Sequence, residues 1–359
     1  MRWSIVLVAV LTLAVGCVDR TPDSPWRELP LPQPGARILA FAPTPGGGVL
    51  ALGSIPAADV RAAAAWSTTD GTHWIPVPVH PETPYGARAE LISAGAGDHT
   101  VILGRAFGGA HSNPRMSVWS GGTHGLTEHE QAFEMFGGSH AIAVSAAAAL
   151  GGVDLLVGDW DGPTGRYGAA YWISVDGANW ERHADDPALS SAPGEQTGAA
   201  AIGTGSPGFV IVGETLRDNI IHPVEWTSPD GSRWQRRELP GTNAVASGIG
   251  CVATCAVFGQ SVGADPHVLC WPMPDTGPLP GPAARNVDVQ QVVPTPSRML
   301  ALIAFDHRAS LVSVSSNCTD WQQISLPAPA DQARMATLPV GLLVAGTGAE
   351  HTGLWLYTL

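Results

Sequence analysis

Short apolar runs separated by turn-forming residues follow one another along the chain. In the first group, Ala36–Ala42 is followed by a Pro- and Gly-rich turn and by the run Val49–Gly53. A third run, Arg61–Thr68, ends at an Asp-Gly turn, and a fourth begins at His73. Runs of this length bounded by Gly, Pro and Asp-Gly are typical of β-strands, and no amphipathic helical period accompanies them. The pattern predicts groups of four antiparallel strands.

A longer phrase indicates that these groups repeat. A Trp, a stretch with Ser or Thr, an Asp-Gly turn and a second Trp stand in this order at Ala63–Trp74, Ala169–Trp180 and Pro223–Trp234. Gly accepts positive φ and Asp bonds nearby backbone N–H groups, so each Asp-Gly pair predicts a tight hairpin. The residues of this turn motif are Asp70, Gly71, Trp74, Asp176, Gly177, Trp180, Asp230, Gly231 and Trp234.

The second run of each group gives the number of repeats, because it ends in Gly. These ends are Gly53, Gly104, Gly158, Gly213, Gly259 and Gly346, with Ala304 assigned to the remaining unit. Seven units with a period near 50 residues predict an all-β, seven-bladed β-propeller of four-stranded blades over 26–359. Six or eight blades is the alternative count.

The two ends of the chain fit a closed ring. The last unit, from Gln332, has room for only three strands, and Trp26–Leu31 resembles the outer strand of the other units. We therefore predict that the N-terminal strand completes the last blade. Closure of this kind leaves no long unpaired sheet edge.

The first 17 residues read as an export signal, with Arg2 before the apolar run Ile5–Val15 and a small residue before Cys17. The run is too short to span a bilayer. Its end resembles a bacterial lipoprotein signal, which implies cleavage at Cys17 and acylation of that residue; ordinary secretory cleavage is the alternative. Residues 18–25 would then be a short tether, and the expected location is the extracytoplasmic face of the cell membrane.

The other four cysteines, Cys251, Cys255, Cys270 and Cys318, form an even set. In an exported protein such a set suggests two disulfides. Cys251 and Cys255 bracket a tight turn and could close a hairpin, whereas Cys270 and Cys318 would join the fifth and sixth units. A metal pair at Cys251 and Cys255 is the less favoured reading, and we expect neither a metal site nor a cofactor.

The charge of the chain bears on its partners. All 18 basic residues are Arg, and 31 acids give a net charge of −13, which argues against nucleic-acid partners. The many Ala, Gly and Pro residues are typical of high-GC bacterial proteins.

The turn motif resembles the Asp-box of sialidases and related propellers, although one residue fewer separates Asp from Gly. The resemblance implies the fold and says little of activity, because in that family the Asp-box lies far from the active site. Of the catalytic residues that the resemblance would require, Arg37 stands near the expected place. However, the fourth to sixth units contain no Tyr for the nucleophile. We predict no catalytic residues.

One face of a propeller carries the blade-to-blade loops and the loops between second and third strands, and we expect the ligand or partner to bind there. A solvated set of loop charges is the alternative. The candidates are Arg105, His111, His129, Glu134, His140, Asp159, Asp161, Arg166, Arg217, Asp218, His267, Asp306, His307, Arg308 and His351.

The sequence thus predicts a membrane-anchored, non-catalytic binding or scaffold module. Its ligand would be an unidentified protein or glycan. A sialidase-like glycan hydrolase and an assembly factor for a membrane complex are the alternatives.

Overall fold

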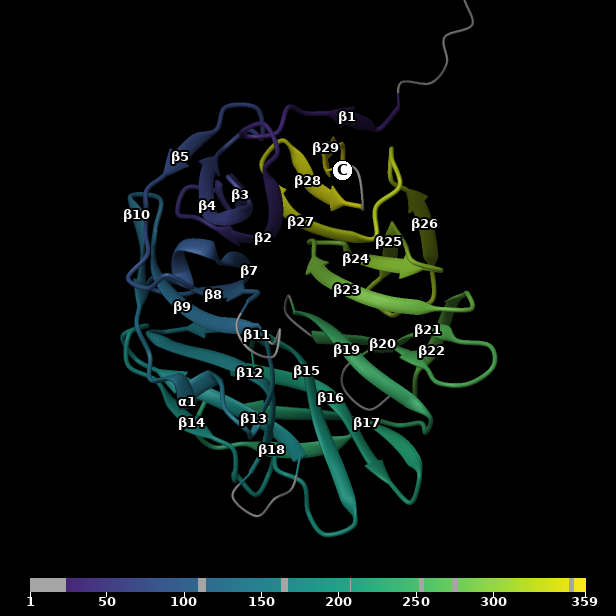
Figure 1. Cartoon of the computed structure of the whole chain (residues 1–359). Coiled ribbons are helices and arrows are strands. Elements are labelled where there is room, and N and C mark those ends of the chain that lie inside the picture. The colour runs from purple at the N-terminus through teal and green to yellow at the C-terminus, as the bar shows by residue number, and fades with distance from the viewer. Residues whose placement is uncertain are drawn as a thin grey trace, which may run out of the picture.

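The computed structural model describes residues 24–108, 114–162, 167–206, 208–251, 255–272, 277–348 and 352–359. Seven antiparallel sheets stand around a central channel, which confirms the predicted seven-bladed propeller (Figure 1). The only helical segments in the described part are single turns at α1 (Phe133–Phe136) and at the 3-10 turn Gly86–Arg88. No helix there is long and apolar enough to cross a membrane.

The blades follow one another in chain order, and in each of blades 1 to 6 the chain runs from the innermost strand outward. Blade 1 comprises β2 (Arg37–Pro43), β3 (Val49–Ala57), β4 (Val60–Thr68) and β5 (Ile75–Val77). Blade 2 comprises β7 (Glu90–Ala96), β8 (Thr100–Ala106), β9 (Arg115–Gly122) and β10 (Gly125–His129). It also has a fifth, two-residue outer strand, β6 (Val79–His80), which runs parallel to β10. Blade 3 comprises β11 (Ala141–Leu150), β12 (Val153–Asp161), β13 (Tyr167–Ser174) and β14 (Glu181–His183).

The second half of the ring repeats this plan. Blade 4 comprises β15 (Glu195–Gly205), β16 (Gly208–Arg217), β17 (Ile220–Ser228) and β18 (Gln235–Glu238). Blade 5 comprises β19 (Ala244–Cys251), β20 (Cys255–Ser261), β21 (His267–Pro272) and β22 (Leu279–Ala283). Blade 6 comprises β23 (Val287–Pro294), β24 (Arg298–Phe305), β25 (Arg308–Ser315) and β26 (Trp321–Ser325).

Blade 7 joins the two ends of the chain. It comprises β27 (Gln332–Leu338), β28 (Gly341–Thr347), β29 (Thr352–Tyr357) and, as its outer strand, β1 (Trp26–Glu28). Trp26 lies opposite Tyr357 and Glu28 opposite Trp355. Figure 1 shows the purple β1 beside the yellow β29. This arrangement is the predicted closure, although the strand is shorter than expected.

The first Trp of each repeat phrase forms the core between blades. Trp66, Trp172 and Trp226 lie on third strands and are at most 2 % exposed. The indole N–H of Trp172 donates to the Met135 carbonyl and that of Trp226 to the Ala188 carbonyl. Each of these carbonyls lies in the connection from the preceding blade to the blade that carries the Trp. The Trp side chain therefore fills the core and also holds this connection on the upper face, by which we mean the face that carries the blade-to-blade loops.

The Asp-Gly turns form as predicted. In blade 3, Asp176 Oδ1 accepts from the backbone N–H groups of Ala178 at 2.9 Å and Asn179 at 2.7 Å. The Ser174 hydroxyl accepts from the N–H of Gly177, whose φ is +68°. The hydrogen-bonding groups of one short turn are thus satisfied locally.

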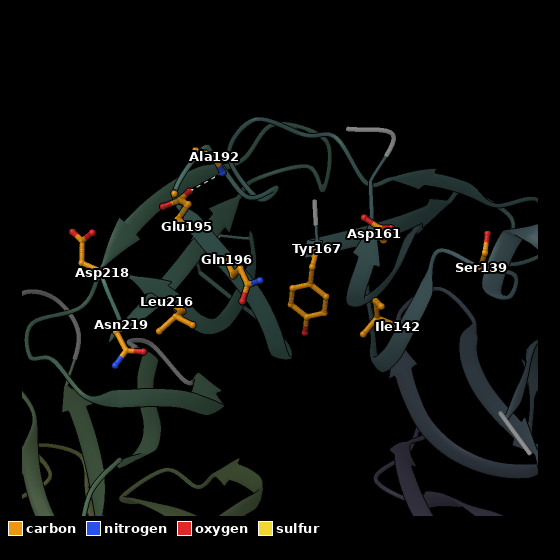
Figure 2. Close-up of a pocket in the computed structure, with 11 residues that line it drawn as sticks. Ser139, Ile142, Asp161, Tyr167, Ala192, Glu195, Gln196, Leu216, Asp218 and Asn219 are labelled. Atoms are coloured by element: carbon orange, nitrogen blue, oxygen red, sulfur yellow. Dashed lines mark hydrogen bonds between the residues drawn. The ribbon is translucent and has the colours of Figure 1, made fainter. Parts of the chain in front are cut away.

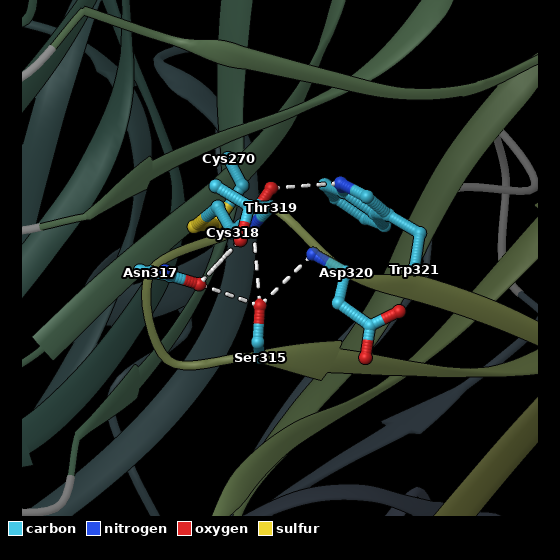
Figure 3. Close-up of a disulfide and its surroundings, with 7 residues drawn as sticks. All are labelled: Cys270, Ser315, Asn317, Cys318, Thr319, Asp320 and Trp321. Atoms are coloured by element: carbon cyan, nitrogen blue, oxygen red, sulfur yellow. Dashed lines mark hydrogen bonds between the residues drawn. A yellow bond between two sulfur atoms is a disulfide. The ribbon is translucent and has the colours of Figure 1, made fainter.

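A fourth copy of this turn in blade 6 has Cys318 where the others have Gly (Figure 3). Its φ is +60°, and Trp321 donates its indole N–H to the Cys318 carbonyl at 2.8 Å, as Trp180 does to Gly177. A Cβ on the turn glycine points at the preceding blade, since at Gly231 it would meet Leu155. Cys318 therefore points at blade 5, where it forms a disulfide with Cys270.

The second disulfide joins Cys251 and Cys255 across the turn between β19 and β20. Both predicted pairings are thereby confirmed. One closes a hairpin and the other links two blades.

The glycines that end the second strands have a steric cause. At Gly158 a Cβ would overlap the carbonyl oxygen of Ala143, and at Gly213 that of Gly198. These carbonyl oxygens come close to the glycines because the inner strand carries a β-bulge. In blade 3, Val144 and Ala146 pair with the consecutive residues Gly158 and Val157, and Ser145 between them is the extra residue. In blade 6 the equivalent position is Ile303 rather than the predicted Ala304, since Val289 before the bulge pairs with Ile303.

Candidate functional site

The bulges give the channel its lining. In each of blades 1 to 6 the bulge leaves one residue of the inner strand unpaired. In blade order these residues are Leu39, Ile92, Ser145, Ala200, Ser247 and Gln290. Blade 7 pairs without a register shift and contributes Arg334 at the same level. All seven residues line two neighbouring cavities of about 420 and 430 Å³ in the channel. The ring therefore carries one cation among neutral side chains.

Three further arginines gather at the upper end of the channel, on the face that carries the blade-to-blade loops. They surround Glu90 at the start of β7: Arg61 lies 3.7 Å from its carboxylate, and Arg37 and Arg105 lie 3.8 Å from it. The Glu90 side chain is 14 % exposed. One partly buried carboxylate thus faces three guanidinium groups.

Arg105 and Arg334 line the same cavity although they come from blades 2 and 7. Burial, together with the charge of Arg105, lowers the pKa of Arg334, and the carboxylate of Asp288 opposes this shift. Within the described residues Arg334 has no ion-pair partner within 4 Å and donates only to the neighbouring Ala333 carbonyl, at 2.7 Å. The Nε of Arg105 is buried without a hydrogen-bond partner among the residues that the structure describes.

We call Arg37, Arg61, Arg105 and Arg334 the arginine cluster. Its four positive charges face two carboxylates, Glu90 and Asp288, in a chain whose net charge is −13. Guanidinium groups with free donors recognise carboxylate and phosphate oxygens in a planar, two-pronged geometry. The channel mouth thus carries more positive than negative side-chain charge.

A larger cavity of about 720 Å³ opens on the same face between blades 3 and 4. Its charged residues in the described part are Asp161, Glu195 and Asp218. Figure 2 shows Tyr167 between the wall that bears Asp161 and the wall that bears Gln196. Arg236 binds Glu195 through two hydrogen bonds of 2.8 and 3.1 Å, so the rim is partly neutralised.

Two carboxyl groups lie next to Tyr167 at the interface of blades 3 and 4. Asp159 on β12 accepts from the Ala199 N–H at 3.0 Å, and Glu214 on β16 faces it. A Cβ at Gly198 would lie 2.9 Å from Glu214 Oε1 and 3.7 Å from Asp159 Oδ1, so these oxygens occupy the space of a missing side chain.

This juxtaposition changes the acidity of all three groups. Burial, reinforced by the charge of Asp159, raises the pKa of Glu214 to about 7. Burial also raises the pKa of Asp159, against the hydrogen bonds from Ala199 and Tyr167. The same burial and the two carboxylates raise the pKa of the Tyr167 hydroxyl. A carboxyl group that ionises near neutral pH is suited to general acid–base chemistry.

The structure distributes the predicted candidates over several sites. Arg105 belongs to the arginine cluster, and Asp161 and Asp218 line the cavity between blades 3 and 4, with Asp159 near Tyr167. Arg217 is paired with Glu238 at 2.9 Å. His267 and Arg308 begin β21 and β25, and Asp306 and His307 form the β24–β25 turn. Cys17, His111, Arg166 and His351 lie outside the described residues.

The densest His and Glu segment of the sequence does not form one site. His129 bonds the Ser120 hydroxyl at 2.7 Å, whereas His140 pairs with Asp161 at 3.4 Å, and Glu134 lies on α1. Among the described residues no three His, Cys, Asp or Glu side chains form a group that could hold a metal ion.

Sequence reasoning missed Arg61, Glu90, Arg334, Tyr167 and Glu214. All five come from strands, each in a different blade, and their neighbours in sequence are ordinary strand residues. The glycine on the second strand marks the bulge of the inner strand in blades 1 to 5, but blade 6 has Ile303 at this position and blade 7, which contributes Arg334, has no bulge. This signal therefore did not single out the five residues.

No family model matches the chain, and comparison with curated proteins gives no match. Solved propellers are similar in fold. U3-55K is 13 % identical, with a TM-score of 0.56 over 93 % of this chain and 98 % of that one. Virginiamycin B lyase from Staphylococcus aureus is 10 % identical, with a TM-score of 0.51 over 92 % of this chain and 98 % of that one. Puromycin hydrolase is 14 % identical, with a TM-score of 0.51 over 89 % of this chain and 53 % of that one. These likenesses show the fold alone.

Proposed function

We propose that this protein is an exported, lipid-anchored binding module that holds an anionic ligand at the channel mouth. The observation that carries the proposal is the arginine cluster. Four guanidinium groups meet there around two carboxylates, and the Arg105 Nε is buried without a partner among the described residues. An unpaired buried donor costs free energy that a bound anion would recover. The export signal and Cys17 support a membrane anchor.

Calorimetric titration of the full-length protein in detergent would test binding. N-acetylglutamate, N-acetylneuraminate and phosphate serve as anionic probes, and N-acetylglucosamine is the neutral control. We expect at least one anion to bind, and Arg334→Gln to weaken it about tenfold or more, since a charge-assisted bond is worth ~1.5–3 kcal/mol.

Arg233→Gln is the matched control variant. It removes one exposed guanidinium that pairs with Asp230 in an Asp-Gly turn, away from the channel mouth. Equal affinity of all probes for the native protein and Arg334→Gln would refute the proposal.

The anchor has a separate test. Metabolic labelling with a palmitate analogue should mark the native chain and leave Cys17→Ser unlabelled, with the variant released from the membrane fraction. Label on both chains, or membrane retention of the variant, would contradict lipidation at Cys17.

A second function, glycan hydrolysis, is favoured by the Asp159–Glu214 pair, which lies behind Tyr167, a residue that lines the 720 Å³ cavity. Two neighbouring carboxyl groups are the usual catalytic pair of glycosidases. Release of methylumbelliferone from a panel of aryl glycosides, abolished by Glu214→Gln, would support it. A rate that Glu214→Gln leaves unchanged would exclude this pair as its source.

A further inference from the structure

Blade 2 carries exposed aromatic rings on the same face as the arginine cluster. Tyr85 is 39 %, Phe107 61 % and Phe133 47 % exposed. They come from three segments: the loop before β7, the residue after β8 and α1. Exposed aromatic side chains with arginines among them are typical of the energetic centres of protein–peptide interfaces.

Two arginines contact these rings: Arg105 contacts Phe107, and Arg115 contacts Phe133 and Tyr85. The Arg115 guanidinium lies 3.9 Å from the Phe133 ring centre and 5.1 Å from that of Tyr85. Within the described residues Arg115 has no ion-pair partner within 4 Å, and its guanidinium group lies over these two rings in cation–π geometry. Arg115 is the cross-strand partner of Ala106, which adjoins Phe107.

Arg105 connects the rings to the channel. Its guanidinium carbon lies 5.3 Å from the Phe107 ring centre, while the same side chain lines the cavity that Arg334 enters. The order Arg334, Arg105, Phe107, Arg115, Phe133 therefore runs outward from the channel across blade 2. We call these five residues and Tyr85 the blade 2 track.

The length and charge of the track select an occupant. Strands lie ~4.8 Å apart, so the path from first to fourth strand is ~14 Å, the span of four to five extended residues. The track has three cations and three rings. An extended peptide with one carboxylate and adjacent apolar side chains matches both features, because the carboxylate would meet Arg105 and Arg334 and the apolar groups the rings.

We propose that the blade 2 track binds an extended segment of a partner protein that presents an acidic side chain flanked by aromatic or aliphatic residues. The inference rests on the proposed function, since it uses the same arginine cluster. It adds the class of ligand, a protein segment. It also adds a specificity surface, namely Tyr85, Phe107 and Phe133 with Arg115.

The test is peptide selection with two readouts. The full-length protein in detergent is immobilised and a random dodecapeptide phage library is panned against it. The selected peptides are then synthesised, and their affinities are measured by fluorescence anisotropy. N-acetylglutamate binding is measured in parallel on the same variants. Phe107→Ser and Phe133→Ser remove exposed rings, and Val175→Ser is the matched control, since Val175 is 74 % exposed in an Asp-Gly turn away from the track.

We expect the selected peptides to share an Asp or Glu with apolar neighbours within four residues. Phe133→Ser should weaken the peptides about tenfold and leave N-acetylglutamate binding unchanged. Phe107→Ser should also weaken the peptides about tenfold, and because its ring contacts Arg105 it is not used to separate the two binding events. Arg334→Gln should weaken both, and Val175→Ser neither.

Other results overturn the inference. If N-acetylglutamate binds but no peptide is enriched, or the enriched peptides lack an acid or ignore both ring variants, the track does not bind such a segment and the anion site still stands. If no peptide binds and none of N-acetylglutamate, N-acetylneuraminate and phosphate binds, the proposed anion site fails as well.

Discussion

Replacing Glu214 by glutamine should make the protein more stable at alkaline pH. The folded state holds a proton on Glu214 up to about pH 7, whereas an ordinary glutamate loses it near 4.5. The unfolding free energy therefore falls as the pH rises from about 4.5 to about 7, and it stays lowered above that range. The difference of about 2.5 pH units corresponds to about 3 kcal/mol at ~1.36 kcal/mol per unit.

The glutamine side chain of the variant has nearly the same size and carries no charge, so the variant should not incur this loss. At ~2.1 cal/mol/K per residue, the unfolding entropy of 359 residues is ~0.75 kcal/mol/K. A change of about 3 kcal/mol in the unfolding free energy therefore shifts Tm by about 4 °C. Differential scanning fluorimetry at pH 5 and pH 8, at constant ionic strength, measures the change in Tm between the two pH values. The native protein should lose about 4 °C more than Glu214→Gln between these pH values.

Asp218→Asn is the control, because Asp218 is exposed on the rim of the neighbouring cavity. It should follow the native profile. Parallel profiles for the native protein and Glu214→Gln would refute the reasoning, since they would mean that Asp159 and burial do not raise the pKa of Glu214.

Two further predictions concern the scaffold. Gly158→Ala should lower Tm by several degrees, because its Cβ would overlap the Ala143 carbonyl oxygen. Gly122→Ala, where a Cβ meets nothing within 4 Å, should have little effect, and equal Tm values for both variants would contradict the steric argument. Cys318→Gly should restore the usual turn residue yet remove the link to Cys270. Because the Cys270–Cys318 disulfide closes a 48-residue loop, its removal should lower the unfolding free energy by about 4 kcal/mol. The urea midpoint of Cys318→Gly should therefore be lower than that of Cys251→Ser, since the Cys251–Cys255 disulfide spans only four residues. Equal midpoints for these two variants would contradict the loop argument.

Features that recur along the chain could be predicted from the sequence. The Asp-Gly turn recurs in several blades, and every blade except blade 6 has a buried Trp on its third strand and a glycine on its second strand. These features repeat because neighbouring blades pack against one another in the same way. The closure by β1 followed from this repeat. The two disulfide pairings followed from the even number of cysteines and from the tight turn between Cys251 and Cys255. Only the structure shows why Cys318 faces Cys270, namely that the residue at this turn position points at the preceding blade.

The site could not be predicted in the same way. Arg61, Arg105 and Arg334 each occur once, on blades 1, 2 and 7, and only the ring closure brings them together. The pKa of Glu214 likewise depends on β16 packing against β12. Such properties arise between blades, where no local pattern records them.

The pairing of β1 with β29 has a consequence for the order of folding. Trp26 and Tyr357 are partners across nearly the whole chain, whereas the other strand pairs of the described residues join segments close in sequence. Loop-closure entropy grows only as the logarithm of length, so this last contact costs ~2 kcal/mol more than joining two neighbouring blades. Closure therefore adds little free-energy cost at equilibrium but comes late in folding, because β29 is synthesised long after β1. Until then the fourth place of blade 7 stays open, and the ring has one sheet edge at which another strand could pair.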